Sequence, residues 1–309
     1  MKKIILDMDP GIDDAAAISV AINNPNLQVE LITSVVGNVT VDRTTTNALK
    51  ILEFFGRTDI PVARGADKPL RRPYQDASSV HGKTGMDGYD FPEPIKKPIE
   101  LTAVEAIHEV VSKSQEKITI VATGAYTNIA NYLNRHPKDF KNIEEMVLMG
   151  GTVSRGNVNS VAEFNIYTDP DAAKIVFDSP VKKTMIGLDV TLKALLTDDT
   201  IDQIEKSGKP GQMLAALFSE YHDGHKGGKP MHDVNTILYL LNPELIKVKS
   251  GFIDVVVGGT ATGATVWDFQ NRIHSVESSN AQIGLKIDPA LFNQWFLEQV
   301  SQMEIQGDK

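Results

Sequence analysis

The sequence contains no cysteine, so it can form neither a disulfide framework nor a thiolate metal site. It has no apolar run long enough to cross a bilayer, and only three apolar residues separate Lys3 from Asp7, too few for a signal peptide. Lys and Arg number 31 against 40 Asp and Glu, and the net charge of -9 disfavours contact with phosphate backbones or anionic lipid. We therefore expect a cytoplasmic protein with no nucleic-acid or membrane partner.

Short apolar segments alternate with amphipathic segments of helical length through the first 190 residues. The predicted strands are residues 4–8, 29–36, 61–63, 118–122, 146–149 and 184–188, and the predicted helices are 14–23, 42–55, 103–112, 128–133 and 170–177. Strands that are apolar on both faces are typical of a parallel sheet covered by helices on both sides. The fold class is therefore predicted as α/β, with an open, mostly parallel, doubly wound sheet.

The alternation weakens after residue 190. Helices are expected at 198–206, 212–222 and 233–241, strands at 251–257, 264–268 and 281–287, and a last helix from Pro289. The two strands within 251–268 predict a β-hairpin, because glycines separate them. No linker or repeat divides the chain, so we expect residues 1–309 to form a single catalytic domain.

Residues 65–100 contain five of the 15 prolines and little periodicity. A loop of this length within a compact domain is more often functional than incidental. Its Gly82-Lys83-Thr84 is not a phosphate-binding loop, because Ala77 stands where that motif requires glycine and no strand precedes it.

Four carboxylates, those of Asp7, Asp9, Asp13 and Asp14, follow one another at the end of the first predicted strand. Ligands of open α/β sheets bind beyond the carboxyl ends of the strands. Taken singly, Asp13 could cap the next helix and Asp14 could interact with its dipole. Together the carboxylates repel one another unless they are protonated or hold a cation, and oxygen ligands suit Ca²⁺ or Mg²⁺. The segment therefore predicts a site for a hard divalent cation.

Polar residues also follow other predicted strands. Asn38 follows the second strand, Thr123 the fourth, and the segment 150–165, which includes Glu163, the fifth. Each has an ordinary alternative as a turn residue, a polar strand end or a solvated charge, and Asp233 could simply cap a late helix. Because the carboxyl ends of parallel strands share one edge, we expect the first three sets to lie beside the aspartates.

These motifs resemble those of the inosine-uridine preferring nucleoside hydrolases. The resemblance rests on residues 7–14 (DMDPGIDD), 81–85 (HGKTG), 147–151 (VLMGG), 162–166 (AEFNI) and 232–233 (HD). It implies a nucleoside hydrolase fold and Ca²⁺-dependent cleavage of the N-glycosidic bond of purine or pyrimidine ribonucleosides to ribose and free base, in nucleoside salvage. It also implies a homodimer or homotetramer.

The resemblance further assigns roles to individual residues. The implied Ca²⁺ ligands are Asp9, Asp14, the Thr123 carbonyl and Asp233. The implied substrate contacts are Asp13 and Asn165 at the 2′ and 3′ hydroxyls, Asn157 and Glu163 at the 5′ hydroxyl, Met149 beneath the ribose, and His81 and Phe164 at the base. Asn38 is implied to orient Asp9 or the water, and His232 to stand near the leaving base.

The chemistry of N-glycosidic cleavage asks for the same residue types. The ribosyl transition state is oxocarbenium-like, so the site needs a poised water and negative potential near the sugar. Asp9 is the candidate general base that activates a metal-bound water. His232 could protonate a departing purine, assist through a network, or only pack around Asp233.

Two other functions are compatible with parts of the sequence. Asp7 and Asp9 superficially match the nucleophile and acid of haloacid-dehalogenase-like phosphatases, although Pro10-Gly11 does not. A non-catalytic Ca²⁺-dependent nucleoside or ribose binder is the second. The preferred base stays open, because the segment before His232 is shorter than the tyrosine-bearing loop of relatives; Tyr221, His222 and His225 are candidate base contacts. Gly124-Ala125 replaces the Gly-Pro of many relatives and is expected to hold the Thr123 carbonyl less rigidly.

Overall fold

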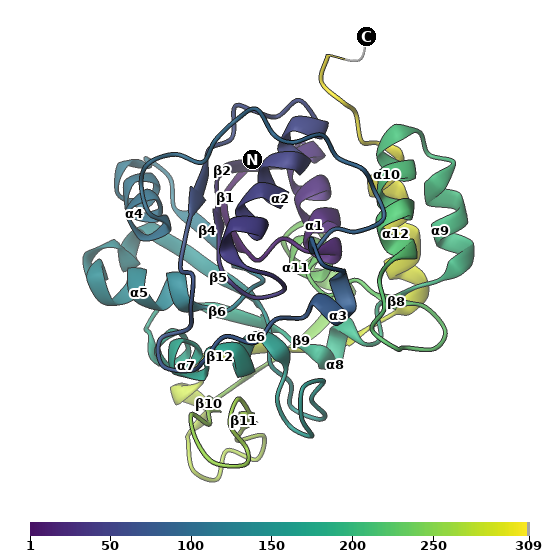
Figure 1. The fold of residues 1–309 in the computed structure, drawn as a ribbon. Helices are drawn as coiled ribbons and strands as arrows, with labels where there is room; N and C mark the ends of the chain where they lie inside the picture. The colour runs from purple at the N-terminus through teal and green to yellow at the C-terminus, as the bar shows by residue number, and fades with distance from the viewer. Residues whose placement is uncertain (308–309) are drawn as a thin grey trace.

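An eight-stranded sheet forms the centre of the protein, as the computed structural model, which describes residues 1–307, shows (Figure 1). The strand order is β3-β2-β1-β4-β5-β6-β12-β9, and every neighbouring pair is parallel except β12 and β9. The strands are β1 (Lys2–Met8), β2 (Leu27–Ser34), β3 (Val62–Arg64), β4 (Ile118–Ala122), β5 (Ile143–Met149), β6 (Lys183–Ile186), β9 (Ile246–Gly251) and β12 (Ala281–Ile287). The predicted open, mostly parallel sheet is confirmed.

Helices cover both faces of this sheet (Figure 1). One face packs against α1 (Ile12–Asn23), α2 (Val41–Phe54), α9 (Asp198–Glu205), α10 (Lys209–Ser219), α11 (Val234–Leu241) and α12 (Pro289–Ser301). The other packs against α4 (Ala103–Lys113), α5 (Thr127–Arg135) and α7 (Pro170–Asp178). Along β1, Ile4 and Leu6 enter the first core and Ile5 the second, which is the alternation of a strand buried on both sides.

The C-terminal third adds a hairpin and completes the sheet. β10 (Ile253–Val255) pairs antiparallel with β11 (Thr265–Trp267), so the predicted hairpin is confirmed. β12 lies between β6 and β9 although it is the last strand in the chain. Short strands and 3-10 helices join these elements: β7 (Leu195–Leu196), β8 (Lys229–Pro230), η1 (Pro137–Asn142), η2 (Pro243–Leu245) and η3 (Val276–Ser278).

Several predicted boundaries were wrong. The strand expected to reach Leu188 ends at Ile186, because Gly187 is the N-cap of the short helix α8 (Leu188–Thr191). The helix expected at 212–222 starts at Lys209, where Pro210 occupies the first turn, and ends at Ser219. Edge strand β9 was not predicted, because most of its residues are exposed and it lacks the apolar signal of the inner strands.

The predicted long loop at 65–100 is regular only at the short helix α3 (Ser78–His81). Two bonds hold its beginning: Ala66 N donates to Asn128 Oδ1 at 2.9 Å, and Leu70 N donates to Asp169 Oδ2 at 2.8 Å. They fix the path of the loop toward the edge of the sheet where β1 ends. Within residues 1–307, no helix has the length and apolar character to cross a membrane.

Candidate active site

The carboxyl ends of four adjacent strands bring the predicted site residues together. Met8 of β1 pairs with Ser34 of β2, Asp7 of β1 with Ala122 of β4, and Ala122 with Leu148 of β5. The parallel register therefore places the residues that follow each strand at one edge. Among them are Asp9 after β1, Asn38 after β2 and Thr123 after β4, as the strand-end argument predicted.

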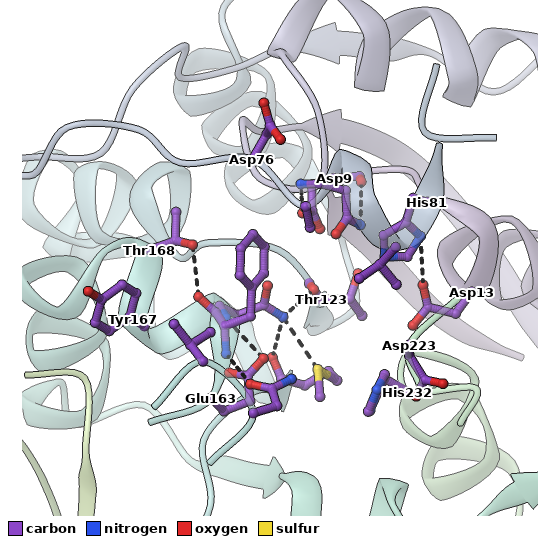
Figure 2. Close-up of a pocket in the computed structure, with 18 of the residues that line it drawn as sticks. Asp9, Asp13, Asp76, His81, Thr123, Glu163, Tyr167, Thr168, Asp223 and His232 are labelled. Carbon is purple, nitrogen blue, oxygen red and sulfur yellow. Dashed lines mark hydrogen bonds and ion pairs between the residues drawn. The ribbon is translucent and has the colours of Figure 1, made fainter. Parts of the chain in front are cut away.

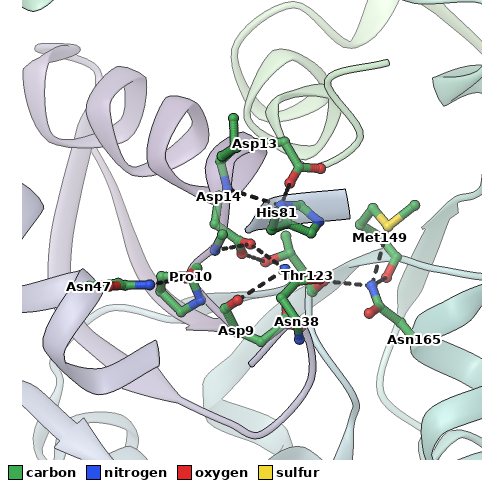
Figure 3. A network of polar contacts seen from close by, with 12 residues as sticks. Asp9, Pro10, Asp13, Asp14, Asn38, Asn47, His81, Thr123, Met149 and Asn165 are labelled. Carbon is green, nitrogen blue, oxygen red and sulfur yellow. Dashed lines mark hydrogen bonds and ion pairs between the residues drawn. The ribbon is translucent and has the colours of Figure 1, made fainter. Parts of the chain in front are cut away.

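Asp9 is held in one orientation by the turn that follows β2. Asn38 donates its backbone N–H to Asp9 Oδ2 at 2.6 Å, and its side-chain Nδ2 donates to the Asp9 carbonyl at 3.1 Å and to Asp14 Oδ2 at 3.2 Å (Figure 3). A Cβ atom at Gly37 would overlap the Asp9 carboxylate, and one at Gly124 would lie 2.8 Å from Asp9 Oδ1. The absence of side chains at Gly37 and Gly124 therefore makes room for the Asp9 carboxylate.

Three further carboxylates meet beside Asp9, at the start of α1 and before α11. Each of Asp13, Asp14 and Asp233 offers an oxygen within 4.8 Å of the other two, and all three are buried. Asp14 accepts hydrogen bonds from Gly11 N at 2.9 Å and from Thr123 Oγ1 at 3.0 Å. Asp13 Oδ1 is buried without a hydrogen-bond partner. The sequence segments that form this cluster are more than 200 residues apart.

Burial raises the pKa of Asp9, Asp13 and Asp233, and repulsion between the neighbouring carboxylates raises these pKa values further. The pKa of Asp13 reaches about 8, and burial also raises the pKa of Asp14. Buried carboxylates this close are stable as anions only when a cation offsets their repulsion. Asp13 Oδ1 accepts no hydrogen bond and lies 3.9 Å from His81 Nδ1. The all-oxygen donor set of the cluster fits a hard divalent ion such as Ca²⁺.

Opposite the aspartates, the residues around α6 (Phe164–Thr168) form the second wall. Glu163 caps this helix: its carboxylate accepts from Asn165 N and Gly151 N, both at 2.9 Å, and burial raises its pKa to about 7. Asn165 Nδ2 donates to the Thr123 carbonyl at 2.6 Å, and Asn157 Oδ1 accepts from Phe164 N at 3.0 Å. The short helix was not predicted, but its cap brings the predicted polar residues to the site.

Two histidines stand at the other end: His81 is buried and His232 is half-buried. His81 Nδ1 accepts the N–H of Ile12 at 3.2 Å, which places the ring proton on Nε2, and its ring meets that of Tyr221 edge-on at 5.2 Å. His232 Nδ1 lies 2.7 Å from Thr191 Oγ1. Burial lowers the pKa of His81 to about 3 and that of His232 to about 4. Both imidazoles are therefore neutral near pH 7.

These walls enclose a cavity of about 320 Å³, which Figure 2 shows in close-up. It is lined by twelve of the thirteen predicted site residues: Asp9, Asp13, Asn38, His81, Thr123, Met149, Asn157, Glu163, Phe164, Asn165, His232 and Asp233. Asp14, the thirteenth, lies beneath the cavity, bonded to Thr123 and Asn38. Of the candidate base contacts, Tyr221 and His225 line the cavity and His222 is absent from its lining.

Some residues of the site were not anticipated. No local sequence pattern marks these residues, because their position in the site depends on contacts between segments far apart in the chain. They are Thr191, Asp223, Arg72 and Tyr167. Arg72 stacks on the Tyr167 ring at 3.9 Å, and both line the cavity. Gly37 could have been noticed, since a glycine directly after a strand often marks a close approach to a ligand or side chain.

Asp7 does not belong to the cavity. Its carboxylate is completely buried and accepts from Thr33 Oγ1 at 2.5 Å and Asn128 Nδ2 at 2.8 Å. It does not line the cavity, so it is not placed to act as a nucleophile toward a bound substrate. The phosphatase alternative, which requires Asp7 and Asp9 to face one substrate, loses its support.

The chain is similar to known proteins over nearly its whole length. The profile of a protein family described as inosine-uridine preferring nucleoside hydrolase matches residues 4–294. The non-specific ribonucleoside hydrolase RihC of Klebsiella pneumoniae is 46% identical over 300 residues, which cover 96% of this chain and 98% of that protein.

Solved structures agree. A purine-preferring ribonucleoside hydrolase from Gardnerella vaginalis superposes with a TM-score of 0.90 at 32% identity, covering 97% of this chain and 98% of the other. A plant nucleoside hydrolase superposes with a TM-score of 0.91 at 31% identity, covering 97% and 99%.

Proposed function

The chain belongs to the inosine-uridine preferring nucleoside hydrolase family and is a ribonucleoside hydrolase, and on that premise we propose that it is a Ca²⁺-dependent enzyme whose general base is Asp9. The observation that carries this proposal is the group of three buried carboxylates, those of Asp13, Asp14 and Asp233, beside Asp9. The alternative of a non-catalytic binder is set aside by the family's activity. We regard residues 1–309 as one catalytic domain, which the span of the family match supports.

Asp9, Asp14, Asp233 and the Thr123 carbonyl are the residues proposed to hold the ion. When Ca²⁺ is bound, it supplies the positive charge that keeps these carboxylates ionised and a Lewis-acid contact for water and hydroxyl oxygens. Asp13 joins the same group, and its Oδ1, which accepts no hydrogen bond within the protein, is buried where it can accept one from a ribose hydroxyl. We therefore keep Asp13 as a sugar ligand.

Asp9 is suited to take a proton from the attacking water. Its Oδ2 is occupied by the Asn38 N–H, so Oδ1 is the atom available to receive the proton. Asn38 bonds both Asp9 and Asp14, and it thereby holds the base against the carboxylate cluster. A positioned general base of this kind contributes about 10²–10⁴ to the rate.

The remaining lining residues are proposed to bind the nucleoside. Asn165 and Asp13 lie at the proposed position of the 2′ and 3′ hydroxyls, and Asn157 and Glu163 at that of the 5′ hydroxyl. Met149 is proposed to lie beneath the ribose, with Phe164 and His81 at the base. The concentration of carboxylates around the sugar favours the positive charge that develops on the ribosyl group as the base leaves.

His232 is proposed to face the departing base. Because its pKa is lowered to about 4 by burial, the ring is neutral near pH 7. A neutral ring bonded through Nδ1 to Thr191 can present Nε2–H as a hydrogen-bond donor. The geometry thus favours assistance through a hydrogen-bond network over proton delivery from an imidazolium.

The substrates are proposed to include both purine and pyrimidine ribonucleosides. The support is the relative described as non-specific, at 46% identity. The test is a panel of inosine, guanosine, adenosine, uridine and cytidine, assayed for ribose and free base with and without a Ca²⁺ chelator. We expect release from at least one purine and one pyrimidine nucleoside, loss on chelation, and recovery on adding Ca²⁺. Undiminished turnover after complete removal of divalent ions would refute the metal requirement.

A further inference from the structure

A second cluster of potential metal ligands lies away from the cavity, at the opposite edge of the sheet. It consists of His108 on α4, His136 at the C-terminal end of α5 and Asp139 in η1. This cluster precedes β5, whereas the cavity begins where β5 ends. A strand of seven residues spans roughly 23 Å, so the cluster cannot contact the substrate. Figure 1 shows α4 and α5 side by side at this edge.

The three side chains are in mutual contact. His108 Nδ1 lies 2.7 Å from Asp139 Oδ2, and Tyr132 donates its hydroxyl to the same oxygen at 3.0 Å. The His136 ring stacks on the His108 ring, with centroids 3.9 Å apart and planes 13° apart. One ligand atom from each of His108, His136 and Asp139 lies within 4.8 Å of the others.

A single histidine–carboxylate pair would be explained by its hydrogen bond alone. The same hydrogen bond does not explain the second imidazole, that of His136. Its ring makes no hydrogen bond to Asp139 in the described residues, and a protonated His108 would repel it if it were also charged. The stack instead places a second nitrogen ligand beside the first, and the neutral imidazole is the form that binds metals.

We infer that His108, His136 and Asp139 form a binding site for one transition-metal ion of the Zn²⁺ class. Two imidazole nitrogens and one carboxylate oxygen are ligands that Zn²⁺ and its neighbours accept, whereas Ca²⁺ prefers oxygen alone. The Tyr132 hydroxyl bonded to Asp139 is the type of outer contact that orients a ligating carboxylate. The two imidazoles are only partly buried, so an ion and its remaining water ligands can reach them.

The ion would displace the proton that His108 and Asp139 share. A bound ion needs the lone pairs of both rings to point at one position about 2.0–2.1 Å from each nitrogen. The stacked rings do not yet satisfy this, so the His136 ring must turn out of the stack as the ion binds. His136 stands between two helices in non-helical backbone, and its ring is half-buried between those of His108 and Tyr132.

The test is metal binding by the full chain in millimolar Ca²⁺, which keeps the aspartate cluster supplied with its preferred ion. Zn²⁺ is measured by equilibrium dialysis, and Co²⁺ by the visible absorption of its nitrogen-bound form. We expect wild type to bind one more Zn²⁺ per chain than His136→Gln or His108→Gln. Since loss of an outer contact alone costs about 10–100-fold in metal affinity, loss of a ligand should cost at least about tenfold in each variant. Zn²⁺ should also raise the melting temperature of wild type and not that of the variants.

His274→Gln is the matched control. His274 lies 3.5 Å from Asp268 and stacks on Phe252, so it is a histidine–aspartate pair without a second imidazole. This variant should keep the extra Zn²⁺. Equal stoichiometry and affinity in wild type, His108→Gln and His136→Gln would overturn the inference, as would wild type that shows no nitrogen-bound Co²⁺ spectrum at saturation. Neither outcome bears on the proposed nucleoside hydrolysis.

Discussion

Asp9 illustrates how much depends on single side chains. Asp9→Asn keeps the shape of the residue and an oxygen that can accept the Asn38 N–H, but it removes the proton acceptor. We expect kcat to fall by about 10²–10⁴ on both inosine and uridine. Steady-state kinetics measures the loss, and calorimetric titration with Ca²⁺ serves as the control for metal binding. A variant with near-normal kcat would show that another group is the base.

The buried Asp13 oxygen that accepts no hydrogen bond predicts that activity depends strongly on the ribose hydroxyls. A site built to bond a hydroxyl rejects an analogue that lacks it by about 10⁴–10⁵. We therefore expect 2′-deoxyuridine to react slower than uridine by about that factor in kcat/KM. Asp13→Ala should reduce the ratio of kcat/KM for uridine to that for 2′-deoxyuridine, because the variant has no carboxylate for the deoxynucleoside to leave without a hydrogen bond. Equal turnover of both nucleosides by wild type would contradict this role.

Thr191 is predicted to position His232. Thr191→Val removes the hydroxyl 2.7 Å from His232 Nδ1 while keeping the shape of the side chain. One hydrogen bond contributes about 0.5–1.5 kcal/mol, so we expect kcat to fall up to roughly tenfold, more for inosine than for uridine. Thr191→Ser should restore it. Nitrogen NMR of the ring distinguishes positioning from general damage, because only loss of positioning redistributes the proton between Nδ1 and Nε2.

At the scale of elements, the turn between β2 and α2 determines where Asp9 lies. A methyl group at Gly37 would collide with the Asp9 carboxylate. Overpacking of this kind costs about 1–3 kcal/mol, and we expect Gly37→Ala to lower both Ca²⁺ affinity and kcat. Gly258→Ala is the control, since a Cβ there meets no atom within 4 Å. If Gly37→Ala and Gly258→Ala have the same Ca²⁺ affinity and kcat, the turn does not constrain the Asp9 carboxylate.

The sequence predicted the elements that carry strong periodicity. The six strands and five helices expected before residue 190 are all present, because inner strands and amphipathic helices have clear apolar patterns. The short helices α6 and α8 were missed, since five or four residues carry no periodic signal. β9 was missed for a different reason: its alternating lysines, Lys247 and Lys249, suit an exposed edge.

The site was predictable where its residues follow strands. Asp9, Asn38 and Thr123 share an edge because the strands before them are parallel and in register. Asp233 was assigned only through the family resemblance, since nothing in the local sequence indicates that it meets Asp14. Thr191 was beyond reach, because its contact with His232 depends on how α8 packs and leaves no mark in the neighbouring residues.

For the whole molecule, Lys183 predicts how stability depends on pH. Its Nζ is buried among the carbonyls of Phe177, Ser179 and Asn280, and burial lowers its pKa from 10.5 to about 8. Between those values the unfolded chain binds more protons than the folded one, so this residue makes stability rise with pH from about 8 and imposes its full penalty below 8.

Urea unfolding of wild type and Lys183→Met at pH 7, 8, 9 and 10 measures this effect. We expect the difference in free energy of unfolding to shift in favour of wild type by up to about 1.4 kcal/mol per pH unit above pH 8. The difference should stay constant from pH 7 to 8. A difference that is flat across the whole range would mean that Lys183 stays charged in the folded protein.

The place of β12 in the sheet has a consequence for biosynthesis. β12 supplies the neighbour of both β6 and β9, yet it is the last strand to leave the ribosome. Until β12 emerges, the N–H and C=O groups on the outer side of β6 have no neighbouring strand. Such an open sheet edge can pair with a strand of another chain. A premature stop codon before residue 281 would therefore yield a product prone to aggregation, and chaperone demand should be greatest late in translation.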